Sequence, residues 1–368
     1  MNKALSQKFR FFTFLCIALL AYVHGYNLEN TYLAPYSTVD EPLTFTSFFE
    51  YFIANGILRF RIPLLFMISG YLYATYDHRP YLQQVQKRFQ TLIIPFLLWS
   101  ALGLALTFLL QQFHYTAEVV YRSQLDQLGD NRPYTEIGWL GILKRWIAAP
   151  IAYQLWFIVA LFVYNLIYPA IKWMVIKIPY IWLPLTFLLF FSLFQFIYVD
   201  GRGLFFFSLG IWIQKKNFSI EKQPEWLSTG LAFIIFIGLT VIKTFMAFEL
   251  EPNKYSSGLT LVIFYQLSIL SGILAMWFGF DKVIRWAMRK RWFVQASSFS
   301  FFLYGIHVPL LPYVMNMALM ELSFLPFYRL ICYLLIPAAV VIACIVWGRF
   351  VRKFTPGLYR ILTGGRGF

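Results

Sequence analysis

Residues 56–76 read GILRFRIPLLFMISGYLYATY, an apolar run with two arginines near its start and no charged residue after Arg61. A helix that crosses a bilayer needs about 20 consecutive, mostly apolar residues. The run has that length and that composition. It therefore predicts a membrane span, and the rest of the chain shows how many such spans to expect.

Nine further apolar stretches are predicted to be spans: 9–27, 90–112, 149–171, 180–199, 203–214, 229–248, 257–279, 297–319 and 328–350. The stretch 203–214 is short, and only Asp200, Gly201 and Arg202 separate it from its predecessor, which indicates a tight hairpin or a re-entrant pair. Charged residues make up 13% of the chain, about half the share in soluble domains. We predict an all-α integral membrane protein with about ten transmembrane helices, a membrane domain over 1–355 and a short basic cytoplasmic tail over 356–368.

The formal net charge of +15 indicates orientation in the membrane rather than a binding surface. Lys and Arg gather at 3–10, 79–88, 172–177, 215–222, 282–291 and 349–366, all on one side of a ten-span arrangement. Cytoplasmic loops of membrane proteins carry this excess. Both termini are therefore predicted to be cytoplasmic, and the lipid bilayer, not a nucleic acid, is the predicted partner of the basic chain.

Two segments outside the spans are expected to be structured. Segment 113–148 is polar, mixed in charge and placed on the outer face, where it predicts a lid or a partly helical cap over a site. Segment 46–57 has the pattern of an amphipathic helix lying at the outer interface. The three cysteines lie in apolar stretches without metal-ligand spacing, so neither a disulfide framework nor a metal site is predicted.

Five ionisable residues are predicted to lie inside or at the ends of spans: Arg10, His24, Arg61, Lys243 and His307. An ionisable side chain in hydrocarbon is costly, so each is a candidate functional residue. Each also has a structural explanation. Arg10 is explained as a topology signal, Lys243 as a side chain that extends to the interface, and the histidines as core residues bonded to backbone carbonyls.

Motifs for soluble hydrolases, zinc proteases, nucleotide-binding proteins and thiol oxidoreductases are not found in the chain. A histidine acting as general base is the chemistry that remains, because its unperturbed pKa is close to neutrality. Arg59, at the outer interface, is expected to pair with Glu50 or with a lipid phosphate.

The chain resembles the membrane-bound acyltransferase-3 family in several stretches that occur in the same order. These are RFFTFLCIALLAYVH at 10–24, RIPLLFMISGYL at 61–72, KRFQTLIIPFLLW at 87–99, LWF at 155–157, FSLG at 207–210, SFSFFLYGIH at 298–307 and LTGGR at 362–366. In that family an arginine precedes a histidine in the first helix, as Arg10 precedes His24. The spacing here is wider than the ten intervening residues of many members.

The resemblance implies acyl transfer, most commonly of acetyl, from cytoplasmic acyl-coenzyme A to a sugar hydroxyl. The implied acceptor is a surface polysaccharide, an exopolysaccharide or its lipid-linked precursor, and the implied location is the bacterial inner membrane. Acetyl-coenzyme A is then a co-substrate, and no permanently bound cofactor is expected. Direct transfer and a transient acyl-enzyme both remain open. A transporter or flippase for a lipid-linked glycan is the alternative from another class, and a catalytically silent scaffold is a third.

The same resemblance, with the chemistry of the side chains, assigns roles to named residues. His24 is the predicted general base, and Arg61 stabilises the oxyanion. Arg10, Lys87 and Arg88 are predicted to hold the phosphates of the coenzyme. Three further residues are predicted to contact the acceptor: Trp156, Tyr304 and His307. The acidic residues considered for orienting His24 are Glu29, Asp40 and Glu50.

Overall fold

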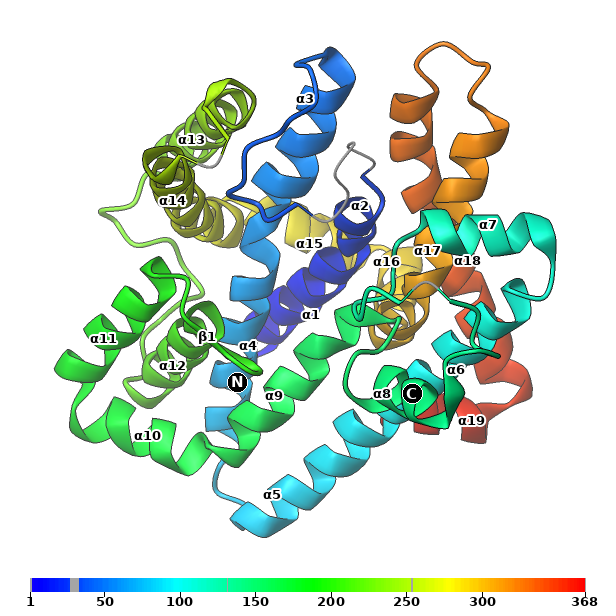
Figure 1. The fold of residues 1–368 in the computed structure, drawn as a ribbon. Helices are drawn as coiled ribbons and strands as arrows, with labels where there is room; N and C mark the ends of the chain where they lie inside the picture. The colour runs from blue at the N-terminus through cyan, green and yellow to red at the C-terminus, as the bar shows by residue number, and fades with distance from the viewer. Residues whose placement is uncertain (1, 27–32, 131, 253, 368) are drawn as a thin grey trace. The chain divides into compact units, whose positions relative to one another are not determined.

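The computed structural model describes residues 2–26, 33–130, 132–252 and 254–367, and nearly all of its regular structure is helical (Figure 1). The chain forms two compact units. Unit 1 comprises residues 1–84 and 163–297, and unit 2 comprises residues 85–162 and 298–368. Helices α5 (Tyr81–Arg88) and α9 (Trp156–Leu166) each run across a boundary between the units. The predicted all-α membrane fold is confirmed.

Unit 1 contains the N-terminal helices and most of the central part of the chain. Its elements are α1 (Lys3–Ala18), α2 (Leu20–His24), α3 (Phe45–Tyr51), the π-helix η1 (Phe52–Gly56), the 3-10 helix η2 (Ile57–Phe60), α4 (Arg61–Thr75), α10 (Tyr168–Lys177), α11 (Pro179–Phe191), β1 (Gln195–Phe196), β2 (Val199–Asp200), α12 (Gly201–Lys215), α13 (Thr229–Glu249), α14 (Tyr255–Gly279), α15 (Asp281–Arg289) and α16 (Arg291–Ser297). Helices α4 and α12 pack closely, as do α13 and α14 (Figure 1).

Unit 2 is built around three long helices and the segment between the third and fourth predicted spans. Its elements are the π-helix η3 (Phe89–Ile93), α6 (Ile94–Leu110), α7 (His114–Arg122), α8 (Gly138–Ile147), the 3-10 helix η4 (Tyr153–Leu155), α17 (Ser300–Glu321), α18 (Tyr328–Phe354) and α19 (Pro356–Leu362). The predicted tail at 356–368 contains α19, and the indole of Trp99 in α6 donates to the carbonyl of Leu362 at 2.9 Å. The division at residue 355 stays a prediction.

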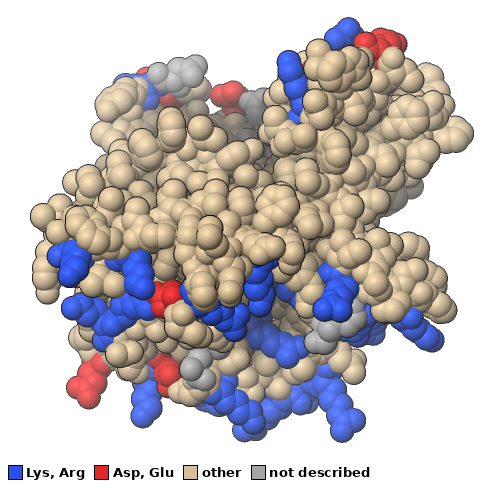
Figure 2. Space-filling model, turned by 90° about the horizontal axis from the view of Figure 1, so that it is seen from below, with Lys and Arg blue, Asp and Glu red and all other residues tan. Residues whose placement is uncertain are grey.

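Seven helices within the described residues are long and apolar enough to cross a membrane, and an eighth is counted if one bent pair forms a single span. The seven are Lys3–His24, Phe45–Thr75, Tyr81–Leu110, Thr229–Glu249, Tyr255–Gly279, Ser300–Glu321 and Tyr328–Phe354. The pair is Tyr153–Leu166 with Tyr168–Lys177, bent by 63°. Large areas of the surface carry no charged side chain, and Lys and Arg gather outside them (Figure 2).

The sequence-based count of ten includes two helices that are short in the structure. Helix α11 has 13 residues and α12 has 15, which is less than a helix needs to cross the hydrocarbon core. The strands β1 and β2 join them in a tight antiparallel hairpin, and Asp200 caps α12 by accepting from the backbone N–H of Gly203 at 2.6 Å. The predicted hairpin is therefore present, while the count of ten and the position of the termini stay predictions.

Segment 46–57 is helical, but its polar side chains are buried, and its position at the outer interface stays a prediction. Helices α3, η1, η2 and α4 form one continuous helical stretch, Phe45–Thr75. Three polar residues of the segment, Ser47, Glu50 and Asn55, are completely buried. An amphipathic pattern alone does not reveal what covers the polar face, and here that face is buried within unit 1 instead of facing water.

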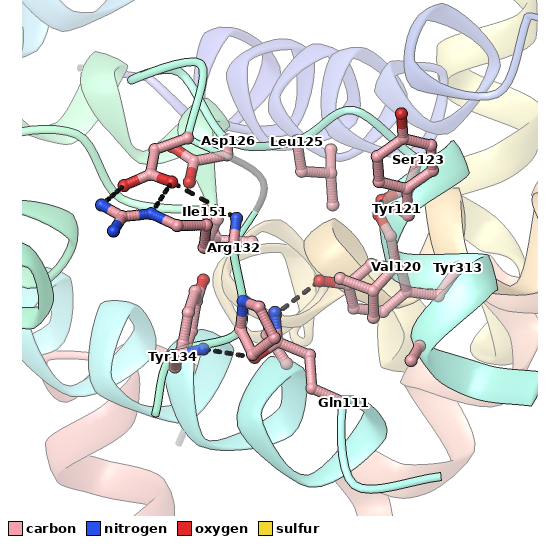
Figure 3. Close-up of a pocket in the computed structure, with 14 residues that line it drawn as sticks. Gln111, Val120, Tyr121, Ser123, Leu125, Asp126, Arg132, Tyr134, Ile151 and Tyr313 are labelled. Atoms are coloured by element: carbon pink, nitrogen blue, oxygen red, sulfur yellow. Dashed lines mark hydrogen bonds and ion pairs between the residues drawn. The ribbon is translucent and has the colours of Figure 1, made fainter. Parts of the chain in front are cut away.

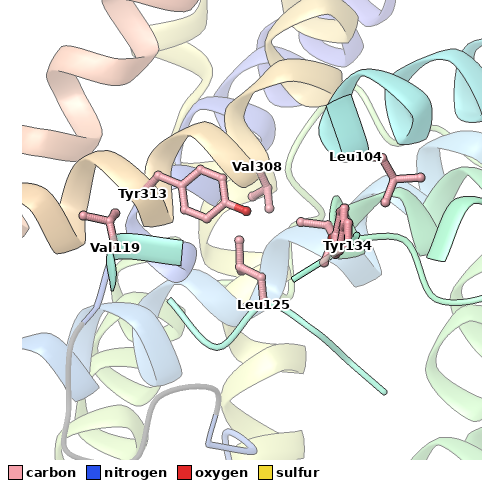
Figure 4. Close-up of a cluster of buried hydrophobic side chains, with 7 residues drawn as sticks. Leu104, Val119, Leu125, Tyr134, Val308 and Tyr313 are labelled. Carbon is pink, nitrogen blue, oxygen red and sulfur yellow. The ribbon is translucent and has the colours of Figure 1, made fainter. Parts of the chain in front are cut away.

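Segment 113–148 is a partly helical cap, as predicted, and it belongs to unit 2. Helices α7 and α8 lie at its two ends. A buried apolar cluster joins the segment to α6 and α17 (Figure 4), and its members are Leu104, Val119, Leu125, Tyr134, Ile151, Val308 and Tyr313. The cap is therefore packed onto α6 and α17 through a shared apolar core.

The contact between α4 and α12 depends on two glycines from stretches that carry the family resemblance. A Cβ atom at Gly70 would lie 2.1 Å from the carbonyl oxygen of Phe207, and one at Gly210 would lie 2.1 Å from that of Met67. Both distances are far below van der Waals contact with a backbone atom, which cannot move aside easily. The two backbones approach this closely because neither position has a side chain.

We expect Gly210→Ala to lower the melting temperature of the purified protein by about 5 °C or more, because overpacking forces the helices apart. Gly238→Ala is the matched control, since that glycine is also inside a membrane helix and nothing lies within 4 Å of an added Cβ. The control should be neutral or slightly stabilising. Differential scanning fluorimetry in detergent measures both, and equal melting temperatures for the two variants would contradict the packing argument.

Candidate active site

His24 lies at the end of a helix that is broken once. Helix α1 ends at Ala18, Leu19 forms a turn, and α2 ends at His24. The imidazole is half-buried, and α2 packs against the π-helix η1. The imidazole thus lies where the first span ends, next to η1.

Arg61 is the first residue of α4, and only 2% of its surface is exposed. Its guanidinium donates to the carbonyl of Cys16 in α1 at 3.2 Å and to the carbonyl of Leu58. Cys16 precedes His24 by eight residues, roughly 12 Å along a helix axis. The structure thus places Arg61 against the helical segment that leads to His24, within the same unit.

Arg10 lies near the other end of the same span. Its Nε donates to the hydroxyl of Ser297 at 2.8 Å, and its Nη2 donates to the carbonyl of Val294 at 2.5 Å. Both acceptors belong to the last turn of α16, so Arg10 joins α1 to that helix end. His24 lies fourteen positions after Arg10, roughly 21 Å along the axis. The two side chains are therefore not brought together by their common span.

Lys243 does not extend to the interface as its sequence context predicts, and this interpretation is wrong. The side chain is completely buried. Its Nζ donates to the carbonyl of Pro35 at 2.6 Å and to the carbonyl of Asn55 at 2.9 Å. The ammonium also lies 4.7 Å from the ring centre of Tyr51. Two carbonyl acceptors and an aromatic face compensate for the loss of hydration.

Asn55 connects this buried lysine to the helix that carries His24. It belongs to η1, on which α2 packs, and its side-chain oxygen accepts from Arg59. Arg59 therefore binds an amide oxygen, a partner that the sequence did not suggest. Single-turn π-helices occur frequently at functional sites. The sequence signal for this arrangement is weak, because a polar residue in segment 46–57 is equally compatible with an exposed surface.

The acidic residues considered as partners of His24 have different locations. Glu29 lies outside the described residues. Asp40 is exposed, whereas Glu50 is completely buried. The orientation of the imidazole by an acidic residue stays a prediction.

Unit 2 contains a group of cations at the start of the span Tyr81–Leu110. Lys87 is exposed and Arg88 is half-buried at the end of α5. Arg366 from the C-terminal segment donates to the carbonyl of Thr91 at 2.8 Å and lies 4.4 Å from the ring centre of Phe301. Burial and the neighbouring charge of Arg88 lower the pKa of Arg366 to about 10. The C-terminal segment therefore adds a third cation, Arg366, which the sequence analysis had explained by topology.

The predicted acceptor-binding residues also lie in unit 2, and two of them are buried. Trp156 begins α9 and is half-buried, whereas Tyr304 and His307 are 4% and 1% exposed. The Tyr304 hydroxyl donates to the carbonyl of Gln154 in η4, the short helix that precedes α9. Nδ1 of His307 lies 3.0 Å from the carbonyls of Leu303 and Tyr304 in its own helix. The structure thus ties Tyr304 to the segment before α9, whereas the two carbonyls beside Nδ1 of His307 belong to α17 itself.

Gln154 is a residue that the sequence analysis missed. Helix α17 is kinked at Val308, before Pro309, where the regular hydrogen bonding is interrupted. The amide of Gln154 lies 3.2 Å from the carbonyl of Val308 and 3.3 Å from that of Tyr304. Its side chain therefore satisfies carbonyls at the kink. A glutamine beside an apolar stretch gives no sequence signal for this role.

Comparison with known proteins shows the family of the chain. A family model described as an acyltransferase domain matches residues 14–347. The succinoglycan biosynthesis protein ExoH of Rhizobium meliloti (strain 1021) is 24% identical over 381 residues, covering 100% of this chain and 94% of that protein. No solved structure matches the chain.

Proposed function

Because the chain belongs to the acyltransferase-3 family, whose model covers nearly all of it, we propose that it is a membrane O-acyltransferase for a bacterial exopolysaccharide. The donor is cytoplasmic acyl-coenzyme A, with acetyl as the leading acyl group, and the acceptor is a sugar hydroxyl of the polymer or its lipid-linked precursor. The observation that carries this proposal is the full-length similarity to a protein named for succinoglycan biosynthesis. The proposed location is the bacterial inner membrane.

In the proposed reaction, His24 accepts the proton of the acceptor hydroxyl while that oxygen attacks the thioester carbonyl. The carbon–sulfur bond breaks, the coenzyme leaves as a thiolate, and the imidazolium returns the proton to it. Arg61 stabilises the negative charge that develops on the carbonyl oxygen. The half-buried position of His24 at the end of α2 supports this role, because a general base must lie within hydrogen-bond reach of the hydroxyl that it deprotonates.

Cations on the basic side of the chain are proposed to hold the phosphates of the coenzyme. Lys87 and Arg88 remain the candidates from unit 2, and Arg366 joins them because its guanidinium packs on the helical stretch that follows Arg88. Arginine offers paired donors to phosphate oxygens, while lysine acts as a point charge. Arg10 stays a candidate from unit 1, although its donors to α16 also explain its presence.

We propose that three residues contact the acceptor: Trp156, Tyr304 and His307. The half-buried indole of Trp156 suits stacking on a sugar ring. Tyr304 and His307 are nearly completely buried, and Tyr304 is bonded to Gln154 in the segment before Trp156.

The proposal is tested by deleting the gene and measuring acyl groups on purified exopolysaccharide by mass spectrometry. Loss of one class of acyl group, restored by the gene on a plasmid, is the expected result. Purified protein in lipid vesicles should also release free coenzyme A only when the unacylated polysaccharide is present. Unchanged acylation in the deletion strain would contradict the proposal.

The same strain distinguishes the flippase alternative, which the buried charges Arg61 and Lys243 within the spans also suit. A flippase deletion would leave unexported glycan on the cytoplasmic face and reduce the amount of polymer outside. An acyltransferase deletion leaves export in place and changes the modification of the polymer.

A further inference from the structure

A pocket opens in unit 2 between the end of α6, helix α7, the segment that follows α7, and α17 (Figure 3). It encloses about 550 Å³ of free space, its open mouth included. All of its lining residues belong to unit 2. The apolar cluster of Figure 4 shares several of these residues, so the pocket has a packed wall on one side.

Aromatic rings and uncharged hydrogen-bonding groups line this pocket together. Tyr121 is 58% exposed at the pocket, whereas Tyr134 and Tyr313 are buried in its wall. The side-chain oxygen of Gln111 accepts from the backbone N–H of Tyr134 at 3.0 Å. Within the described residues, the amide nitrogen of Gln111 has no acceptor. This amide can therefore donate to a ligand while its oxygen holds the pocket wall.

The charges at the pocket balance one another. Arg132 donates to both carboxylate oxygens of Asp130, each at 2.9 Å. Arg145 is 2% exposed, and its Nε donates to Asp126 at 2.8 Å. Hydrogen bonds from Arg132 lower the pKa of Asp130 to about 2, so this carboxylate stays charged at physiological pH. Two carboxylates and two guanidinium groups leave no net charge to attract a phosphate or a cation.

A buried arginine also holds the shape of the pocket rim. Arg145 belongs to α8, and besides Asp126 it donates to the carbonyl of Asp130 at 3.0 Å and to that of Gly141 at 3.3 Å. These bonds tie the segment that follows α7 to α8. Since breaking a buried ion pair is costly, the rim is a built feature of the cap and not a chance gap in a loop.

The pocket lies at one end of α6 and α17, and the cations Lys87, Arg88 and Arg366 lie at the other end. Along the stretch Tyr81–Leu110 and its continuation, Arg88 precedes Gln111 by 23 residues, roughly 35 Å of helix. Along α17, Phe301 contacts Arg366, whereas Tyr313 lines the pocket. The lining residues include no histidine and no cysteine. The pocket is therefore suited to binding and not to acyl transfer.

We propose that this pocket binds a neutral sugar of the acceptor glycan, at a position other than the one that is acylated. The proposal rests on the proposed function for the identity of the glycan. Carboxylate and amide groups paired with aromatic rings suit a sugar, because its hydroxyls need acceptors and donors and its C–H face packs on a ring. The balanced charge disfavours anionic ligands, and the polar lining disfavours purely apolar ones.

The test uses the full-length protein in lipid nanodiscs and two variants of the pocket. Tyr121→Ala removes an exposed ring from the mouth, and Gln111→Glu removes the amide donor while keeping the acceptor for Tyr134. The probe is the unacylated repeating-unit oligosaccharide from the exopolysaccharide of the deletion strain. Tyr115→Ala is the matched control, because Tyr115 lies on the same helix, is 40% exposed and does not line the pocket.

Isothermal titration without acyl-coenzyme A measures binding in the His24→Ala background, where no turnover is expected. Each pocket variant should raise the dissociation constant for the oligosaccharide by about tenfold, and Tyr115→Ala should leave it unchanged. In the wild-type background, the same variants should raise the KM for the acceptor about tenfold. The kcat at saturating acceptor and the KM for acyl-coenzyme A should not change.

Wild-type affinity in both pocket variants overturns the proposal, as does the absence of oligosaccharide binding to the parent protein. Displacement of the oligosaccharide by inorganic phosphate also overturns it, since the pocket would then prefer anions. Failure of the proposed function has a different signature. If the oligosaccharide binds in a way that depends on Tyr121 but the wild-type protein transfers no acyl group, the sugar-binding pocket stands. The proposed acyltransferase function is then refuted.

Discussion

His24→Ala is expected to lower acyl transfer to the polysaccharide by about 1,000-fold or more, because a general base contributes up to about four orders of magnitude. The substitution removes a half-buried ring at the end of α2, so the protein should still fold and insert. Coenzyme A release by purified protein in vesicles, with unacylated polysaccharide as acceptor, measures the effect. Mass spectrometry of the exopolysaccharide from a complemented strain gives an independent reading.

His78→Ala is the control for this prediction, because His78 is an exposed histidine between α4 and α5. This variant should acylate at the wild-type rate. If His24→Ala retains a tenth or more of the wild-type rate while its melting temperature is unchanged, His24 is not the base. A second group would then have to accept the proton.

Arg61→Ala is expected to reduce kcat by about 100-fold or more and to lower the melting temperature as well. The loss of activity follows from the loss of a cation beside the developing oxyanion, an interaction that contributes about two to three orders of magnitude in other acyl transfers. The loss of stability follows from burial, because the carbonyls of Cys16 and Leu58 lose their donor. Steady-state kinetics and scanning fluorimetry measure the two effects separately.

Arg61→Lys separates catalysis from packing. A lysine retains the positive charge but cannot direct two donors to Cys16 and Leu58 with the geometry of a guanidinium. The melting temperature should recover in part, while kcat stays low if the planar donor pair is needed at the oxyanion. Full recovery of kcat with only partial recovery of the melting temperature would show that charge alone suffices. Recovery of kcat in proportion to the melting temperature across both variants would assign Arg61 to structure only. Arg122→Ala, which breaks an exposed pair with Glu118, should change neither quantity.

Residues of the candidate site differ in how far they could be predicted. His24 is found from its position in an apolar stretch and from the family resemblance, because both are local properties of the chain. Arg366 is not found as a binding candidate, since a basic residue near a terminus is explained equally well by topology. Only the folding of α19 onto α6 brings Arg366 close to Arg88.

Membrane character, the approximate limits of the spans and the family were determined by the sequence alone. The physical reason is that hydropathy sums over neighbouring residues, so a run such as 56–76 specifies its environment without knowledge of any distant residue. Two predicted spans nevertheless form short helices, because the length of an apolar run does not reveal where the hairpin β1–β2 ends a helix.

The partners of the polar side chains were decided only by the tertiary structure. Lys243 has carbonyl acceptors at Pro35 and Asn55, both more than 180 residues away along the chain. The sugar pocket likewise joins residues between Thr107 and Ile151 with Tyr313. A buried polar group is stable only if a partner compensates for lost hydration. Which residue provides that partner depends on how distant helices pack, and no local pattern in the sequence contains this information.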